Sequence, residues 1–359
     1  MKRVLHIVNK WEKGGVERYI EGLATEISAS EVVPSVLSIC TDVTTGAPLN
    51  KYGPLVAGRG YFALLRGVLL MGAFLDAHTF DVAHIHASNA SCCLIAYICE
   101  RHGVPSRIVH SHSTSMSFET SKIKRSLNSM LLKLYAGHET LRIGCSSEAA
   151  RALFGQKDSL VVPNGVDVDR FAFDAAERLA LRKNLKIDED CFVVLCVGSF
   201  VEVKNHLRSI RIFDHVQRVL QKSKLVMVGD GPLRPAIEDA VKKLNLSNKV
   251  IVAGFAEDVA TWYSLADVML FPSFYEGLPI SLVEAQANGL PVVCSDTITR
   301  EVGLLENCRF ESLQAQDEVW ARDLMSGVRV SSEAAAVKIR AMGFDKQSSI
   351  EKVKRAYGI

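Results

Sequence analysis

The sequence lacks an apolar run long enough to cross a membrane. A transmembrane helix needs about 20 consecutive apolar residues, and the longest apolar stretches, at 67–75 and 91–98, are less than half of that length. The first residues lead directly into a strand-like segment at 4–8, which is too short for the apolar core of a secretory signal peptide. We therefore expect a protein that stays in the cytoplasm.

The cysteines lack the spacing of a disulfide framework or of a zinc site. There are nine of them, an odd number, and no two are arranged as Cys-x-x-Cys. Several lie in apolar, strand-like runs. We expect reduced, buried thiols and no structural zinc ion.

A large excess of charge of one sign is also lacking. The 42 Lys and Arg residues and 40 Asp and Glu residues leave a net charge of +2, so binding of nucleic acid through bulk charge is not expected. Residues 1–165 carry 17 basic against 13 acidic residues, and residues 166–359 carry 25 against 27. The first half is therefore the more basic one.

The sequence does contain two successive series of short apolar strands that alternate with amphipathic helices. Its 359 residues favour two domains, at roughly 100–200 residues per domain. In the first series the strands are expected at 4–8, 33–40, 81–86, 107–112, 141–145 and 160–162. In the second series they are expected at 192–197, 224–228, 249–253, 268–271 and 292–294.

This alternation predicts an α/β protein in which each half forms a parallel sheet with helices on both faces. A turn cluster at 162–167 and a polar, helix-favouring stretch at 175–190 separate the two series. We expect two Rossmann-like domains, 1–165 and 166–344, that face a cleft. The C-terminal helix, 345–359, is expected to pack back on the first domain.

The segment after the strand at 268–271 carries the strongest indication of a site. Pro279 suits the first turn of a helix, and two carboxylates, Glu276 and Glu284, flank that helix start. The exposed amides and the dipole of a helix start attract an anion such as a diphosphate, and Glu284 can accept hydrogen bonds from a vicinal diol. The plainer alternative, a capped helix with a solvated glutamate, does not account for two carboxylates at this spacing.

Three glycine-containing turns follow other expected strands. Lys204 comes after one of them and can neutralise a phosphate as a point charge, although a surface lysine is the alternative. Gly231 belongs to a second turn, which suits either a nucleotide or a purely structural turn. Gly14 and Gly15 precede the first helix. Their spacing matches neither a nicotinamide site nor a P-loop.

Histidines concentrate in the first half of the chain, where eight of the ten precede residue 139. His110 and His112 lie at the end of one expected strand, and His84 and His86 lie at the end of the preceding one. No acidic residue lies nearby in the sequence, so a metal site is disfavoured. We expect His110 or His112 to contact a substrate hydroxyl or phosphate, and His84 to be structural.

Together these motifs resemble the family 4 glycosyltransferases, which are retaining enzymes of the GT-B fold. Glu276 and Glu284 match the family's E-x7-E signature, and segments 14–18, 162–167, 197–206 and 228–232 follow in the family's order over nearly the whole chain. The amino-acid sequences of segments 110–113 and 204–206 are most similar to those of bacterial capsular and exopolysaccharide transferases.

The resemblance implies a hexosyltransferase that moves a sugar from a nucleoside diphosphate donor to a polysaccharide or lipid-linked acceptor. The donor would be a UDP-sugar, such as one that carries an N-acetylhexosamine. Family members work without a bound metal, so no cofactor is implied. The resemblance implies that the catalytic residues are His112, Glu276 and Lys204. It implies that the donor-binding residues are Gly14, Gly15, Ser199, Lys204, Gly231, Gly277, Leu278, Pro279 and Glu284.

One position departs from the family's pattern. The family usually places Arg where this chain has Ser199, five residues before Lys204, and the two cations together stabilise the departing diphosphate. Arg208, one helical turn after Lys204, is a candidate substitute. Two alternatives stay open: a GT-B epimerase or hydrolase that acts on a UDP-sugar without an acceptor, and a non-catalytic nucleotide-sugar-binding protein.

The basic stretch Lys122–Lys133 predicts a helix with one apolar and one basic face. Such a helix suits peripheral contact with an anionic membrane on the inner face of the plasma membrane. An ordinary surface helix of the domain explains the pattern equally well.

Overall fold

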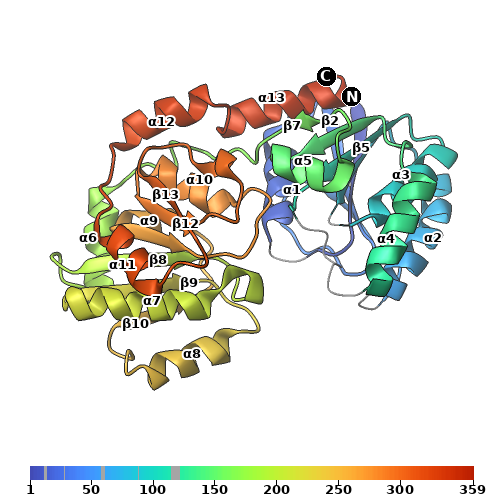
Figure 1. Cartoon of the computed structure of the whole chain (residues 1–359). Coiled ribbons are helices and arrows are strands. Elements are labelled where there is room, and N and C mark those ends of the chain that lie inside the picture. The colour runs from blue at the N-terminus through green and yellow to red at the C-terminus, as the bar shows by residue number, and fades with distance from the viewer. Residues whose placement is uncertain (12–13, 28, 58–60, 88, 115–121) are drawn as a thin grey trace. The chain divides into compact units, whose positions relative to one another are not determined.

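Short apolar strands alternate with amphipathic helices twice along the chain, and each series forms its own parallel sheet (Figure 1). The computed structural model describes residues 1–11, 14–27, 29–57, 61–87, 89–114 and 122–359. One unit comprises Met1–Asn164 together with Gln347–Ile359, and the other comprises Gly165–Lys346. The predicted α/β class, with one parallel sheet in each half, is confirmed.

The N-terminal unit is built on a seven-stranded sheet with the order β3-β2-β1-β4-β5-β6-β7. Its strands are β1 (Lys2–Val8), β2 (Val32–Ser38), β3 (Asn50–Tyr52), β4 (Val82–Ala87), β5 (Ser106–Ser111), β6 (Leu141–Gly144) and β7 (Leu160–Val161). Its helices are α1 (Gly15–Glu26), α2 (Tyr61–Ala77), α3 (Ser91–Arg101), α4 (Lys122–Tyr135), α5 (Ser147–Phe154) and α13 (Lys346–Tyr357). The short edge strand β3 was not expected, because its Asn-Lys-Tyr sequence has no apolar run.

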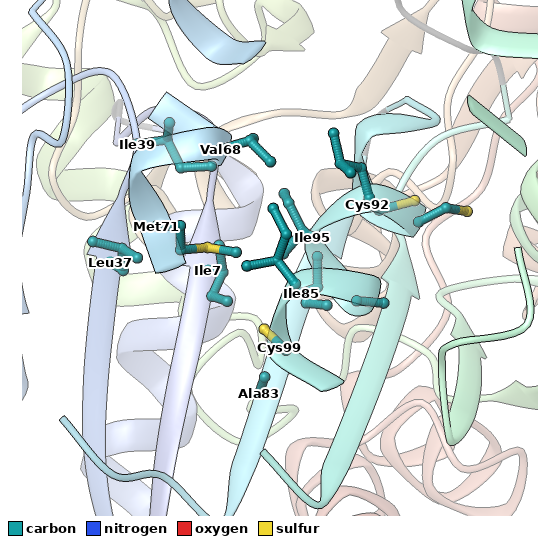
Figure 2. Packing of buried hydrophobic residues seen from close by; sticks show 14 of the residues in the cluster. Ile7, Leu37, Ile39, Val68, Met71, Ala83, Ile85, Cys92, Ile95 and Cys99 are labelled. Carbon is teal, nitrogen blue, oxygen red and sulfur yellow. The ribbon is translucent and has the colours of Figure 1, made fainter. Parts of the chain in front are cut away.

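Successive side chains of a strand point to opposite faces of the sheet, and the two faces of this sheet have different cores. One core lies under α2 and α3, and Figure 2 shows part of it, with Ile7 and Ile85 of the sheet close to Met71 of α2 and Ile95 of α3. The other core lies under α1 and α13 and includes Val4 and its neighbours on β4 and β5.

The last helix, α13, belongs to the N-terminal unit. Ile350, Val353 and Tyr357 recur at helical spacing and are buried in the core that also contains Val4 and Val82. An apolar stripe of this kind is stable only when another surface covers it. The chain therefore enters the second unit after Asn164 and returns to the first at Gln347.

The C-terminal unit is built on a six-stranded sheet with the order β10-β9-β8-β11-β12-β13. Its strands are β8 (Phe192–Val197), β9 (Ser223–Val228), β10 (Val250–Gly254), β11 (Val268–Phe271), β12 (Val292–Ser295) and β13 (Cys308–Glu311). Its helices are α6 (Ala175–Asn184), η1 (Glu202–Lys204), α7 (His206–Val219), α8 (Arg234–Lys243), α9 (Ala260–Leu265), α10 (Ile280–Ala287), η2 (Arg300–Val302), α11 (Asp317–Met325) and α12 (Ser332–Ala341). The edge strand β13 was not expected.

The first helix of this unit is shorter than the sequence indicates. The polar stretch at 175–190 suggested a longer helix, but α6 ends at Asn184. Lys186 has a φ of 54°, and Ile187 N donates to Arg182 O at 2.9 Å. A left-handed residue followed by this hydrogen bond is a common way for a helix to end.

The strand order reverses once in each sheet. In the N-terminal sheet, β2 and β3 lie on one side of the β1–β4 pair and β5 to β7 lie on the other. In the C-terminal sheet, β9 and β10 lie on one side of the β8–β11 pair and β12 and β13 lie on the other. Ligands of open α/β sheets bind beyond the carboxyl ends of the strands at such a reversal. We therefore expect a ligand-binding site in the segments that follow these four strands.

All nine cysteines are free, and eight of them are buried. Within the described ranges, no helix combines the length and the apolar character that a membrane span requires.

Candidate functional site

Lys204 and Glu276 follow the two strands that flank the reversal in the C-terminal sheet. Lys204 ends η1 after β8, and Glu276 lies in the loop after β11. Lys204 Nζ is 2.6 Å from Glu276 Oε1, and it also lies 4.8 Å from the ring centroid of Phe271. Both charged side chains are less than one-fifth exposed, so solvent screens this ion pair only in part. The structure thus brings together two of the three predicted catalytic residues.

Two hydrogen bonds connect the loop that carries Lys204 to the loop that carries Glu276. Asn205 Nδ2 donates to Pro272 O at 3.1 Å, and Phe274 N donates to Val203 O at 2.8 Å. Asn205 itself is left-handed, with a φ of 54°, a conformation that asparagine tolerates better than most residues. The position of the ion pair is therefore set by the backbone as well as by the two charges.

The glycine turns after β8 and β9 pack directly on each other. Gly229 has a φ of 150°, and a Cβ there would lie 2.0 Å from Gly198 O. Gly231 has a φ of 157°, and a Cβ there would lie 2.7 Å from Phe200 O. The structural interpretation of the Gly231 turn is thus supported, because only glycine allows this approach. Ser199, the next predicted residue, lies in the same pair of loops.

His206 holds the Ser199 turn in place, a role that was not predicted from the sequence. Its Nε2 donates to Ser199 O at 3.1 Å, and its ring packs edge-on against Phe200. Burial lowers the pKa of His206 to about 4. The imidazole is therefore neutral at physiological pH, with its proton on the nitrogen that donates.

The helix after Glu276 begins close to the expected position. Pro279 is the N-cap of α10, with φ −72° and ψ 104°, and its side chain cannot cap the helix. Gly277, Leu278 and Pro279 are buried. A helix start without a side-chain cap keeps amide donors and the positive end of the dipole available for an anion.

Glu284 lies in the second turn of α10 and is 8% exposed. Its Oε2 accepts a hydrogen bond of 2.7 Å from the hydroxyl of Tyr263, a fully buried residue of α9. Tyr263 was not predicted from the sequence, because nothing in the spacing of the two residues marks it as a partner of Glu284. The hydrogen bond orients the carboxylate that the E-x7-E pattern singles out.

The suggestion that Arg208 replaces a missing cation beside Lys204 is wrong. Arg208 Nε donates to Asp317 at 2.9 Å, and its two terminal nitrogens each donate at 2.6 Å to Leu313 O and Ala315 O. The guanidinium also lies over the ring of Trp320. Arg208 therefore connects α7 to the start of α11, and its guanidinium nitrogens are used in these contacts.

Gly14 and Gly15 lie after β1, beside the reversal in the N-terminal sheet. Gly14 is the N-cap of α1 with an extended backbone, and Gly15 is the first helical residue. Gly14 has no side chain with which to cap this helix, and the Glu17 carboxylate lies close by, since a Cβ at Gly14 would be 2.7 Å from Glu17 Oε2. Among the predicted site residues, these two glycines and His112 belong to the N-terminal unit, and the other eight belong to the C-terminal unit.

Five histidines gather on one face of the N-terminal sheet. His6 of β1 is in register with His84 of β4, and His86 of β4 is in register with His110 of β5. His112 follows the end of β5. Residues two apart on a strand point the same way, so register alone stacks these rings. His6 was not predicted from the sequence, because only the pairing of β1 with β4 brings it to the cluster.

The five rings form two hydrogen-bonded rows. In the first row, His6 Nδ1 lies 3.0 Å from His86 Nε2, and His86 Nδ1 lies 2.9 Å from His112 Nε2. In the second row, Tyr357 Oη lies 2.7 Å from His84 Nδ1, and His84 Nε2 lies 3.1 Å from His110 Nδ1. His84 is thus hydrogen-bonded within the fold, as a structural histidine is.

Burial keeps all five imidazoles neutral. It lowers the pKa of His6 and of His112 to about 3. It lowers the pKa of the other three, His84, His86 and His110, well below the usual value, and the neighbouring histidines act in the same direction. His6, His84, His86 and His110 are buried and His112 is half-buried, so a charged ring here would lose much of its hydration.

Within the described part of the chain, the candidate groups for a metal ion are two triplets drawn from this cluster. They are His6, His84 and His86, and His86, His110 and His112, and in each triplet the ligand nitrogens lie within 4.8 Å of one another. Both triplets consist of imidazoles alone. The expectation that the enzyme needs no metal stays a prediction.

The predicted amphipathic helix is α4, and its outer face is mixed. Arg125 and Lys133 are exposed, and so are Met130 and Leu134, which are 46% and 61% exposed. The side chains of residues 122–124 lie outside the described residues. Leu69 of α2, at 71%, is a further exposed apolar residue of this unit.

Two parallel-sheet units with polar candidate residues beside each strand reversal are the architecture of GT-B glycosyltransferases. Residues 13–170 match the family model described as Glycosyltransferase Family 4, and residues 177–302 match the one described as Glycosyl transferases group 1. The chain therefore belongs to the family 4 and group 1 glycosyltransferases, and it is an enzyme of the hexosyltransferase type. The resemblance drawn from its motifs is confirmed.

Two curated relatives are similar to the chain in sequence, and one solved structure is similar to it in fold. EpsF of Bacillus subtilis, provisionally named a glycosyltransferase, is 29% identical over all of this chain and 97% of its own length. A UDP-Gal:alpha-D-GlcNAc-diphosphoundecaprenol alpha-1,3-galactosyltransferase of Escherichia coli is 26% identical over 65% of this chain and 62% of its own. HepE of Anabaena, solved in complex with UDP and glucose, is 16% identical to this chain. The structural match covers 100% of both chains with a TM-score of 0.80, which shows that the two proteins share a fold.

Proposed function

We propose that this enzyme transfers a sugar from a UDP-sugar, such as a UDP-N-acetylhexosamine, to a lipid-linked or polysaccharide acceptor in surface polysaccharide biosynthesis, with retention of the anomeric configuration. The observation that carries the proposal is the Lys204–Glu276 pair beside the uncapped start of α10. The Escherichia coli relative supports it, because its name gives a UDP-galactose donor and a diphosphoundecaprenol-linked acceptor.

In this proposal the donor diphosphate lies between Lys204 and the start of α10. The ammonium group and the helix amides stabilise the negative charge that grows on the diphosphate as the bond to the sugar breaks. Lys204 then exchanges its contact with Glu276 for contacts with phosphate oxygens. Glu276, with the amides of Gly277 and Leu278, faces the sugar, and the carboxylate of Glu284, oriented by Tyr263, binds the ribose diol.

The acceptor hydroxyl attacks the anomeric carbon on the face from which the diphosphate departs. The bond from the anomeric carbon to the phosphate oxygen breaks, the bond to the acceptor oxygen forms, and the acceptor's proton passes to the departing diphosphate. In this proposal His112 positions the sugar at the reacting centre, and Gly14 and Gly15 supply backbone amides from the start of α1. Ser199 and Gly231 line the phosphate side. No step requires a metal ion.

A panel of UDP- and GDP-sugars tests the function. A donor that binds the folded protein must raise its Tm by mass action, and we expect a UDP-sugar to give the largest shift. Turnover is then measured with and without lipid-linked acceptor, in the presence and absence of EDTA. We expect acceptor-dependent transfer that EDTA does not reduce. Acceptor-independent hydrolysis or isomerisation as the main reaction would contradict the transferase assignment.

We further propose that α4 brings the enzyme to anionic lipid on the inner face of the plasma membrane. Exposed Arg125 and Lys133 alternate with exposed Met130 and Leu134 along this helix, and basic residues near an anionic surface contribute about 1 kcal/mol each. A lipid-linked acceptor would then lie close to the enzyme that uses it.

Vesicle co-sedimentation tests the membrane contact. With vesicles that contain anionic lipid, we expect Lys122/Lys124/Arg125→Ala to bind at least about tenfold more weakly than the wild type, since three such charges are lost. The matched control, Lys183/Lys242/Lys243→Ala, removes three exposed charges from the C-terminal unit and should bind as the wild type does. Equal binding by the two triple variants would remove this proposal.

A further inference from the structure

Four of the five clustered histidines have no part in the proposed sugar transfer. Only His112 is placed at the sugar, yet it is hydrogen-bonded through His86 to His6. Tyr19 of α1 lies edge-on to His112, with the ring centroids 5.6 Å apart. His6 and His86 are buried, at 1% and 6% exposed. Buried polar groups in a connected network restrict one another's geometry.

The row His6–His86–His112 allows only two arrangements of protons. A neutral imidazole carries one proton, so one ring nitrogen donates and the other accepts. His86 uses both of its nitrogens inside the row, and each contact needs one donor and one acceptor. It follows that the proton lies on Nδ1 in all three rings or on Nε2 in all three rings. A mixed row would leave two protons or two lone pairs facing each other at about 3 Å.

We propose that His6 and His86 are positioning residues that fix the tautomer and orientation of His112. In one arrangement, His112 presents an N–H donor on the side away from the row, and in the other it presents a lone pair. His112 cannot change from donor to acceptor unless both other rings change with it. The inference rests on the proposed function in one respect only, which is that His112 faces the donor sugar.

This arrangement gives the site a defined preference for its ligand. A ring that only donates binds a hydroxyl oxygen or a phosphate oxygen, and a ring that only accepts binds a hydroxyl proton. An isolated imidazole would exchange between the two tautomers and would serve neither role fully. Proteins generally fix the tautomer of a functional histidine through a hydrogen bond at its other ring nitrogen, and here a second imidazole makes that bond.

The second row of the cluster offers a matched control. Tyr357, His84 and His110 form hydrogen bonds of the same kind, at the same depth and on the same face of the sheet. No hydrogen bond joins this row to His112 among the contacts of the described residues. Tyr357→Phe therefore removes one buried hydrogen bond of the cluster while the first row stays intact.

The tautomers can be measured directly on the full chain labelled with 15N-histidine. Long-range 1H–15N spectra at neutral pH identify the protonated nitrogen of each ring. We expect His6, His86 and His112 to share one tautomer, in the wild type and in Tyr357→Phe. Mixed tautomers within the wild-type row would overturn the proposal. So would spectroscopic evidence that added Co²⁺ binds the row, because a bound cation would replace these hydrogen bonds.

Kinetics then test whether the row acts through His112. We expect His86→Leu to lower kcat by about 10- to 100-fold, as a misplaced group at a reacting centre does, with donor KM changed by less than about twofold. His86→Asn keeps a polar group where Nδ1 lies and should recover part of the loss. Tyr357→Phe should keep the wild-type kcat. The Tm of each variant shows that it is folded under the conditions of the assay.

The double variant separates a positioning role from a structural one. In a His112→Ala background, His86→Leu should cause no further loss of kcat, because residues that act through one group are not additive. An equal loss in both backgrounds would overturn the positioning role. If His112→Ala itself had normal kinetics while the shared tautomer was observed, the place of His112 in the proposed function would fail and the row would stand.

Discussion

Replacing Lys204 by alanine is expected to lower kcat/KM for the donor by about 10²- to 10³-fold. A single preorganised group that stabilises developing negative charge contributes on this scale, and the substitute that the sequence suggested, Arg208, is bound to Asp317 and to two carbonyl oxygens. Glu284→Ala is expected to weaken donor binding and to have less effect on the chemical step. It removes a hydrogen-bond acceptor for a group remote from the reaction, so it should raise donor KM by about 10- to 100-fold and leave kcat closer to normal.

The matched control for Lys204 is Lys222. It belongs to the same unit and is also paired with a carboxylate, that of Asp190, at 2.5 Å, but its side chain is 69% exposed. Lys222→Ala should leave the steady-state constants unchanged, because an exposed ion pair of this kind contributes little. Steady-state kinetics with the donor identified by the panel provide the measurement. Near-normal constants for both Lys204→Ala and Glu284→Ala would refute the assignment of the donor site.

Acidification is expected to unfold the N-terminal unit well before the C-terminal unit. An unfolded chain binds a proton at each histidine below pH 6.5, whereas the folded cluster does not, so stability falls as the pH drops from about 6.5 toward about 3. With folded pKa values of about 3, His6 and His112 together would lower the free energy of unfolding by about 4 kcal/mol at pH 5. His84, His86 and His110 act in the same direction.

Pulse-labelled hydrogen exchange can follow the two units separately. Samples are equilibrated with urea at pH 7.5 or pH 5, labelled briefly at one common pH, and analysed by mass spectrometry. The buried histidine of the C-terminal unit is His206, whose folded pKa of about 4 lowers the free energy of unfolding of that unit by about 2 kcal/mol at pH 5, whereas the N-terminal unit has five such histidines. We expect the urea midpoint to fall much more for the N-terminal unit. An equal fall for both units would contradict the prediction.

The fold class was predictable because its signals are local. Strand and helix segments such as 192–197 and 147–154 carry enough apolar periodicity to be located without tertiary information, and the structure places β8 and α5 there. The edge strands β3 and β13 were missed for the opposite reason. Each is short and mostly polar, and it is a strand only because a neighbour supplies hydrogen bonds.

The residues of the candidate site that lie in sequence motifs were predictable. The contacts that depend on strand pairing or on other tertiary structure were not. Lys204 and Glu276 were expected from their places after two strands, but their direct contact depends on Asn205 and Phe274 binding across the loops. Tyr263 is 21 residues from its partner Glu284, and His6 is 80 residues from His86. No local pattern encodes either pair.

The position of α13 has a consequence for how the protein is made. The core that contains Val4 and Val82 is covered only when Ile350 and Val353 dock on it, and these residues are synthesised after the whole C-terminal unit. At 5–20 residues per second the ribosome needs on the order of 10–35 s to make that unit. The nascent N-terminal unit must wait that long with an apolar face open, and it is then that chaperones would be expected to bind it.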